Sequence, residues 1–105
     1  MAHRITEADL QRRVDYLNRI TDSPAQYIDD FATCKPAIGH WHLSHAYGGV
    51  ALHRTMNSGG GVTSYLTAGH VPKRELFNAL CAFLEGIEYV DREIQTGRGW
   101  PNRSE

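Results

Sequence analysis

The chain has 105 residues and a mass of 11.8 kDa, which suffices for one domain but not for a second domain with its own core. Hydrophobic residues make up 41% and charged residues 22%, ordinary proportions for a folded globular protein, so a disordered or fibrous class is excluded. No apolar run approaches the roughly 18 residues that a membrane-spanning helix needs, which excludes transmembrane functions.

The cysteine spacing and the N-terminal sequence favour a cytoplasmic protein. Cys34 and Cys81 are too far apart in the chain to form a metal or redox motif, and the first thirty residues lack an apolar run that resembles a signal peptide. A chain of this size buries roughly 65% of its unfolded surface, which leaves no room for a deep enclosed site. We therefore expect a site that is shallow or shared between subunits.

Charge is unevenly distributed, although the net charge is only −1. Residues 31–74 contain no acidic residue, carry a charge of +4 and include five of the six histidines. The basic residues of this segment are Lys35, Arg54, Lys73 and Arg74. All twelve acidic residues lie in the flanking segments. This separation predicts a two-faced molecule whose ligand is anionic.

The N-terminal part predicts a helix over residues 7–20. Thr6 is suited to be its N-cap, with Asp9 at the third helical position, and an apolar stripe runs from Leu10 to Ile20. Pro24 cannot continue a helical ladder, so the helix is expected to end near Thr21.

The central part predicts a small antiparallel sheet. A short strand is expected around Tyr27, Ile28 and Phe31, followed by a turn at Lys35-Pro36. Alternation then predicts strands from Trp41 to His45 and from Val50 to Thr55, joined by a tight turn at Gly48-Gly49. After a loop at residues 57–61, residues 62–66 are expected to form a third strand.

The C-terminal part predicts the main helix over residues 72–94. Pro72 suits its first position, and a broad apolar stripe includes Leu76, Leu80 and Phe83. The expected fold is α+β, a two-layer sandwich with two helices over one face of a sheet of about three strands. Residues 1–96 form the single domain and residues 97–105 a tail. Trp100 in this tail and the large apolar stripe predict a homo-oligomer, with the site at a subunit boundary.

Several short motifs run from the middle of the chain to the start of the last helix: Trp41-His42-Leu43, Ala46-Tyr47-Gly48-Gly49, Leu52, Arg54, Asn57, the glycines 59–61, Gly69 and Lys73-Arg74-Glu75-Leu76. A chain with these motifs resembles a recurrent group of small bacteriophage proteins for which no catalytic residues are established. The resemblance implies an accessory protein that is made in the infected host cytoplasm and acts on a host system.

Catalytic and metal-binding motifs are incomplete. His40 and His42 at alternate strand positions, with Cys34 upstream, suggest zinc, but His45 falls on the opposite face and the segment has no carboxylate. Ser44-His45 and Ser58 with His53 lack a group that would orient the base. Paired carboxylates are missing from residues 31–74. We therefore expect no enzymatic activity, no metal and no cofactor.

The expected site binds an anion. Arginine and lysine side chains at Arg54, Lys73 and Arg74 contact the anion, the loop amides of Gly59, Gly60 and Gly61 assist, and His42 or Tyr47 contacts the remainder of the ligand. Cationic residues at the start of a helix oppose its dipole, which is more readily explained if an anion binds there.

These residues predict a non-enzymatic binding protein that sequesters a small, nucleotide-like anion, such as a cyclic nucleotide that serves as a host immune signal. Two alternatives stay open. The order helix, three strands, helix is also that of double-stranded RNA-binding domains, although acidic helices would repel a long polyanion. An inhibitor that docks on a host protein is the other alternative.

Overall fold

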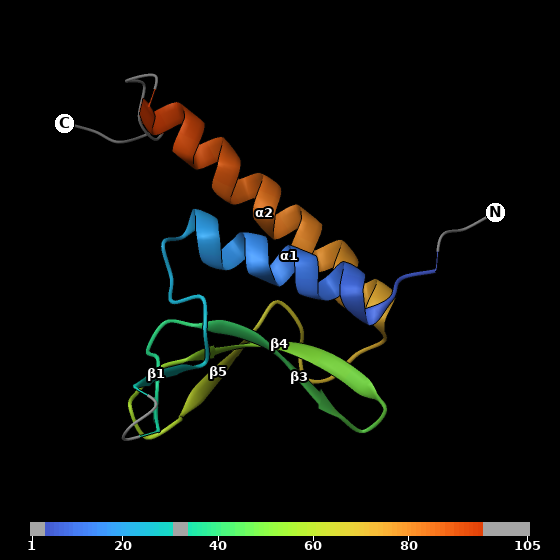
Figure 1. The fold of residues 1–105 in the computed structure, drawn as a ribbon. Helices are drawn as coiled ribbons and strands as arrows, with labels where there is room; N and C mark the ends of the chain where they lie inside the picture. The colour runs from blue at the N-terminus through green and yellow to red at the C-terminus, as the bar shows by residue number, and fades with distance from the viewer. Residues whose placement is uncertain (1–3, 31–33, 96–105) are drawn as a thin grey trace.

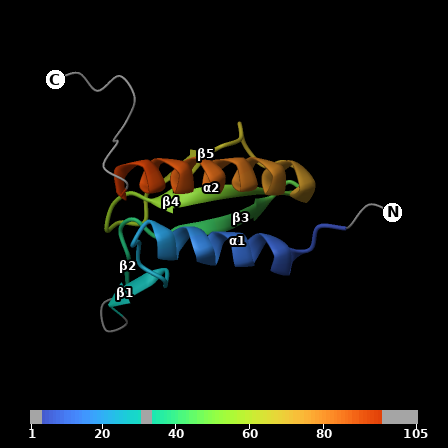
Figure 2. The same cartoon turned by 90° about the horizontal axis from the view of Figure 1, so that it is seen from above.

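The computed structural model describes residues 4–30 and 34–95 and has a two-layer α+β fold (Figure 1). In chain order the elements are α1 (Glu7–Ile20), β1 (Ile28–Asp30), β2 (Lys35–Pro36), β3 (Trp41–Ala46), β4 (Gly49–Thr55), β5 (Val62–Tyr65) and α2 (Lys73–Gln95). Strands β3, β4 and β5 form an antiparallel sheet in that order. Both helices lie on one side of this sheet, and from above they run side by side in the same direction (Figure 2).

Helix α1 confirms the predicted boundaries because its capping residues act as expected. The Thr6 side chain accepts a hydrogen bond from the Asp9 amide, and the Asp9 carboxylate accepts one from the Thr6 amide. Together these bonds satisfy two of the helix's unpaired amides. The apolar stripe of α1 faces the sheet, and Leu10, Val14 and Leu17 are fully buried.

The turn between β3 and β4 lies one residue earlier than predicted. Tyr47 and Gly48 both have positive φ, 55° and 76°, and Gly49 already belongs to β4. Two consecutive residues with positive φ form the kind of tight turn that matches the right-handed twist of a hairpin. This turn pairs Trp41 with Arg54, His42 with His53 and Ala46 with Gly49.

The segment before β3 also differs from the prediction. Lys35 and Pro36, expected as a turn, form β2 and pair with β1 in a separate two-stranded ribbon. Pro36 is tolerated there because an edge position does not need its missing amide hydrogen. Of the residues expected in the first strand, Ile28 lies in β1, whereas Phe31 lies outside the described residues.

Helix α2 begins one residue after Pro72, whose carbonyl accepts hydrogen bonds from the amides of Glu75 and Leu76. Its first half completes the core, since Leu76 and Leu80 are fully buried against the sheet and α1. The predicted tail at residues 97–105 lies outside the described residues. No helix formed by residues 4–30 and 34–95 is long and apolar enough to span a membrane.

The strand alternation sorts the side chains of the sheet onto two faces. Trp41, Leu43, Val50 and Leu52 belong to the core or pack against it, on the side of the helices. Residues in between, such as His42, Ser44 and His53, therefore point to the other face. We call this second face, which has no helix on it in Figure 1, the open face.

Candidate ligand-binding face

A continuous row of six aromatic rings crosses the open face. We call it the histidine strip; its members, in spatial order, are Tyr27, His40, His42, His53, His70 and Tyr47. The rings of His40 and His42 stack with centroids 5.6 Å apart and an angle of 15°. The other neighbouring rings meet edge to face, at centroid distances of 5.3 to 6.2 Å. Four imidazoles thus form a chain in which each ring contacts the next; His40 is 8% exposed, and the other three are partly buried.

The hairpin register and one bridge bring these residues together. His42 and His53 are direct partners on β3 and β4, and their ring centroids are 5.9 Å apart. Val71 pairs with Val50 beyond the end of β5, which brings the preceding residue, His70, to the same part of the sheet. His70 then contacts His53 at 5.9 Å and Tyr47 at 6.0 Å.

Two histidines of the strip have a lowered pKa. Burial lowers the pKa of His42 from its ordinary value of 6.5, and the neighbouring His40 and His53 lower it further. Burial and the nearby His70 lower the pKa of His53 in the same way. The lowered pKa values favour the neutral form of both rings at pH 7, in which each offers one N–H donor and one acceptor. His42 Nδ1 is buried with no hydrogen-bond partner among the described residues.

The ends of the strip are held by hydrogen bonds. His40 Nδ1 lies 2.7 Å from the carbonyl of Pro24, which can only accept, so this nitrogen carries the hydrogen. Ser44 Oγ and His70 Nε2 are 3.0 Å apart. A serine beside an imidazole is part of a nucleophilic site, but such a site also needs a group that orients the imidazole. The acid-free segment supplies no carboxylate for this role.

Two predicted site residues lie in the strip. His42 occupies its centre, and Tyr47, in the hairpin turn, is 98% exposed at one end. Lys73 and Arg74 are exposed at the start of α2, a few residues after His70. The bridge between Val71 and Val50 thus brings the start of α2 close to the Tyr47 end of the open face.

Arg54, in contrast, does not join this group. Its guanidinium lies over the Trp41 ring at 4.8 Å, on the helix side of the sheet, and its Nε donates to the Gly39 carbonyl at 3.1 Å. Along β4, Arg54 is four residues from Val50, about 13 Å at the rise of a strand. The prediction that Arg54, Lys73 and Arg74 converge on one anion is therefore not supported, because Arg54 lies at the opposite end of β4 from the bridge that leads into α2.

The amides of the glycine loop at residues 59–61, which were predicted to bind the anion, already donate hydrogen bonds within the loop. Asn57 Oδ1 accepts hydrogen bonds from the amides of Gly59 at 3.0 Å and Gly61 at 2.9 Å. The Gly60 amide donates to the Asn57 carbonyl at 3.1 Å. The three amides thus close the loop on Asn57 instead of converging on an anion.

The histidines that suggested zinc do not lie on one face of the sheet. His40 and His42 share a face, and His45, as predicted, lies on the other, where its Nε2 is 2.8 Å from Glu7 Oε2. Among the described residues, no group of three or more histidine, cysteine or acidic side chains is arranged to hold a metal ion.

The predicted ligand-binding residues did not include four members of the strip, Tyr27, His40, His53 and His70; His40 was considered only for zinc and His53 only beside Ser58. The period-two pattern of β3 and β4 contains the signal for His53, since it places His42 and His53 on the same face of a hairpin. His70 follows β5 and joins the strip through the Val71 bridge, for which local sequence gives no signal.

No protein family model matches the chain, and no curated protein and no solved structure matches it either. The function is therefore inferred from the chemistry of the open face.

Proposed function

We propose that this protein is a non-enzymatic binding protein that sequesters a small, anionic, nucleotide-like ligand on the histidine strip. The observation that carries this proposal is the continuous row of six rings, five of which come from residues 31–74, a segment that has no acidic residue. The resemblance to small bacteriophage proteins supports a setting in the infected host cell, with a cyclic nucleotide immune signal as the ligand.

The rings favour a ligand that contains a base. Aromatic and imidazole rings on an exposed sheet are the surfaces on which single bases stack in nucleic-acid-binding proteins. Tyr47 supplies the most accessible ring, since its side chain is 98% exposed and lies beside His70. In this proposal the base stacks at the Tyr47 end of the strip.

The polar atoms of the strip favour an anion. Neutral imidazoles donate N–H groups to phosphate oxygens, and the acid-free segment places no carboxylate of its own against the ligand. Lys73, exposed at the start of α2, adds a cation near the same end of the face. Phosphate oxygens are therefore expected to lie against His53 and His70, at the end of the strip that is nearer to the start of α2.

Binding without cleavage follows from what the strip lacks within the described chain. The imidazole of His70, which lies beside Ser44, has no carboxylate in the acid-free segment to orient it. The lowered pKa values of His42 and His53 favour neutral imidazoles, which have no proton to spare for a leaving group at pH 7. Because the face is shallow, a homo-oligomer in which a second subunit closes over the ligand is part of the proposal.

Titration calorimetry against cyclic and linear nucleotides tests this function, with chromatography of each mixture to detect products. We expect at least one nucleotide to bind and to be recovered unchanged. Product formation, or no binding across the panel, would overturn the proposal. Binding of a long single-stranded oligonucleotide in preference to every nucleotide would favour the nucleic-acid alternative.

A matched pair of histidine variants locates the site. His53→Gln changes the strip, whereas His45→Gln changes the same residue type on the opposite face of the sheet. Loss of one hydrogen bond to the ligand should weaken binding by roughly 3- to 10-fold in His53→Gln, and His45→Gln should bind like the unmodified protein. Equal affinities of the two variants would exclude the open face as the site.

A further inference from the structure

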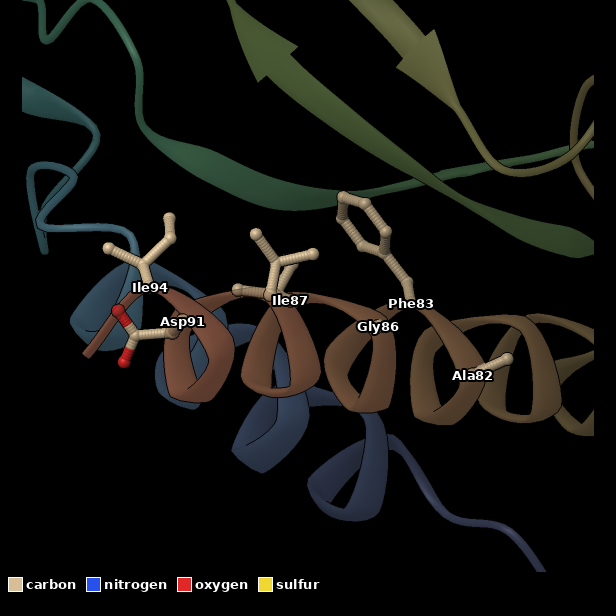
Figure 3. A pocket seen from close by; sticks show the side chains of 7 residues that line it. Ala82, Phe83, Gly86, Ile87, Asp91 and Ile94 are labelled. Atoms are coloured by element: carbon tan, nitrogen blue, oxygen red, sulfur yellow. The ribbon is translucent and has the colours of Figure 1, made fainter. Parts of the chain in front are cut away.

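The second half of α2 carries an apolar groove that belongs to a different part of the molecule. The groove has a volume of about 600 Å³ and is lined by Phe83, Ile87, Val90 and Ile94, with Asp91 at its edge. Phe83, Ile87 and Ile94 extend from the same side of the helix toward the strands (Figure 3). We call this site the α2 groove.

The groove exists because α2 is longer than the elements that cover it. Helix α1 has 14 residues and α2 has 23, a difference of about 13 Å at the rise of an α-helix. The apolar stripe of α2 is fully buried at Leu76 and Leu80, whereas Ile94 is 58% exposed. The groove therefore begins at Phe83 and Ile87, which still pack against the core, and becomes uncovered toward Ile94, where the stripe continues past its partners.

We infer that the C-terminal segment of this same chain, residues 96–105, occupies the α2 groove through Trp100. This segment follows Gln95 directly, and Trp100 is its one large apolar residue. Five extended residues reach up to about 17 Å, whereas Gln95 and Ile87 are about 12 Å apart along the helix axis. Trp100 is thus within reach of the groove.

The residues around Trp100 are suited to this reversal of the chain. Gly97 and Gly99 precede Trp100 in the sequence, and glycine is the residue that most readily adopts the left-handed conformations that end a helix and reverse a chain. A tryptophan that enters an apolar groove removes the apolar surface of a large ring from water, which is favourable.

Charge favours this occupant over a second copy of the helix. Residues 85–93 of α2 contain four acidic residues and one arginine, whereas residues 96–105 contain two arginines and one glutamate. The tail therefore brings positive charge to an acidic helix. A second α2 packed on the same face would instead bring acidic side chains against acidic side chains, which is unfavourable.

Acrylamide quenching of tryptophan fluorescence in the full chain tests the inference. The chain has two tryptophans and Trp41 is only 4% exposed, so a change in quenching reports Trp100. We expect Trp100 in the unmodified protein to be quenched several-fold less than in a free peptide of residues 96–105. Ile94→Ser and Val90→Ser should raise the quenching toward that of the peptide.

Tyr89→Ser is the matched control because Tyr89 lies in the same turn of α2, is 45% exposed and does not line the groove. It should leave quenching unchanged. Ile94 is largely exposed, so its replacement leaves the core intact, and circular dichroism verifies the helix content. Full quenching of Trp100 in the unmodified protein, or protection that Ile94→Ser and Val90→Ser both leave intact, would overturn the inference. Protection that disappears on dilution by about two orders of magnitude would also overturn it, because a second copy would then fill the groove.

Discussion

Tyr47 combines an unfavourable backbone conformation with an almost completely exposed side chain. Its φ is 55° and its side chain is 98% exposed. A left-handed conformation costs a residue with a side chain roughly 1–2 kcal/mol, and asparagine tolerates it best after glycine. The fold alone therefore favours asparagine at this position, and the ring of Tyr47 is explained more readily by the ligand than by folding.

Tyr47→Asn should separate these two roles. We expect the free energy of unfolding to rise by up to about 1 kcal/mol, because asparagine fits the turn. We expect nucleotide binding to weaken, because the stacking ring is lost. Urea unfolding and calorimetry on the same variant measure both effects, and unchanged nucleotide affinity would argue against Tyr47 as a ligand contact.

Arg54→Ala should weaken the fold without weakening ligand binding. The change removes the contact of the guanidinium with Trp41 and the hydrogen bond to Gly39, which together are worth about 1–2 kcal/mol. Thermal unfolding measures the loss of stability. A loss of nucleotide affinity at unchanged stability would instead support the prediction that Arg54 contacts the ligand.

The lowered pKa values of His42 and His53 predict a loss of stability on acidification. In the unfolded chain both histidines take up a proton near pH 6.5, whereas in the folded protein they do so only at lower pH. The unfolded state therefore binds more protons in this window, and the free energy of unfolding falls as the pH drops below 6.5. Urea unfolding from about pH 8 to about pH 5 should show a smaller decrease in the double variant His42→Gln/His53→Gln. Equal decreases in the two proteins would contradict the assignment.

At the scale of single elements, Asn18 connects α1 to the edge of the sheet. Its side chain is 3% exposed, donates from Nδ2 to the Trp41 carbonyl at 3.0 Å and accepts at Oδ1 from the Trp41 amide at 2.9 Å. The amide group thereby occupies the place of a neighbouring strand beside β3. This contact protects the edge of the sheet and fixes where α1 crosses it.

Asn18→Ala should therefore destabilise the protein by roughly 2–4 kcal/mol, because it leaves the Trp41 amide and carbonyl without their partner. Asn78→Ala, at an exposed position of α2, is the control and should have little effect. Urea unfolding measures both variants. A loss of similar size in the two would mean that Asn18 contributes no more than an ordinary helix residue.

At the scale of the whole molecule, the open face and the α2 groove lie on different layers. The first is on the sheet side that has no helix, and the second lies along the helix layer (Figures 1 and 3). If the tail fills the groove, subunits of the predicted homo-oligomer must meet through the sheet. The edge strand β5, with exposed Val62, has no strand on its outer side among residues 4–30 and 34–95 and offers that edge for the contact.

Light scattering at micromolar concentration tests the predicted homo-oligomer. We expect a mass at least twice that of the 11.8 kDa chain. A mass near that of one chain over the whole concentration range would contradict the prediction and would require the ligand to bind to a single open face. Mass spectrometry of small molecules that co-purify with the protein would identify the ligand whether the protein is a monomer or an oligomer.

Much of the fold could be predicted because its signals are local. The capping residues and stripe of α1, the alternation in β3 and β4, and the stripe of α2 are contained within single elements. The hairpin shows that such local signals do not determine the strand register. Placing the turn at Gly48-Gly49 keeps each side chain on its face but pairs His42 with Thr55, whereas the turn at Tyr47-Gly48 pairs it with His53. A shift of one residue in the turn changes every partner by two residues, and the histidine strip depends on the partner.

By itself the sequence determined the class of the fold, the two faces of the sheet and the acid-free segment, because these follow from periodicity and composition. The tertiary structure decided which residues meet. It placed Arg54 on Trp41, closed the glycine loop on Asn57, and joined His70 to His53 through a bridge between residues 21 positions apart in the chain. Contacts of this kind depend on the strand register and on the path of the β5–α2 connection, which no local pattern of residues encodes.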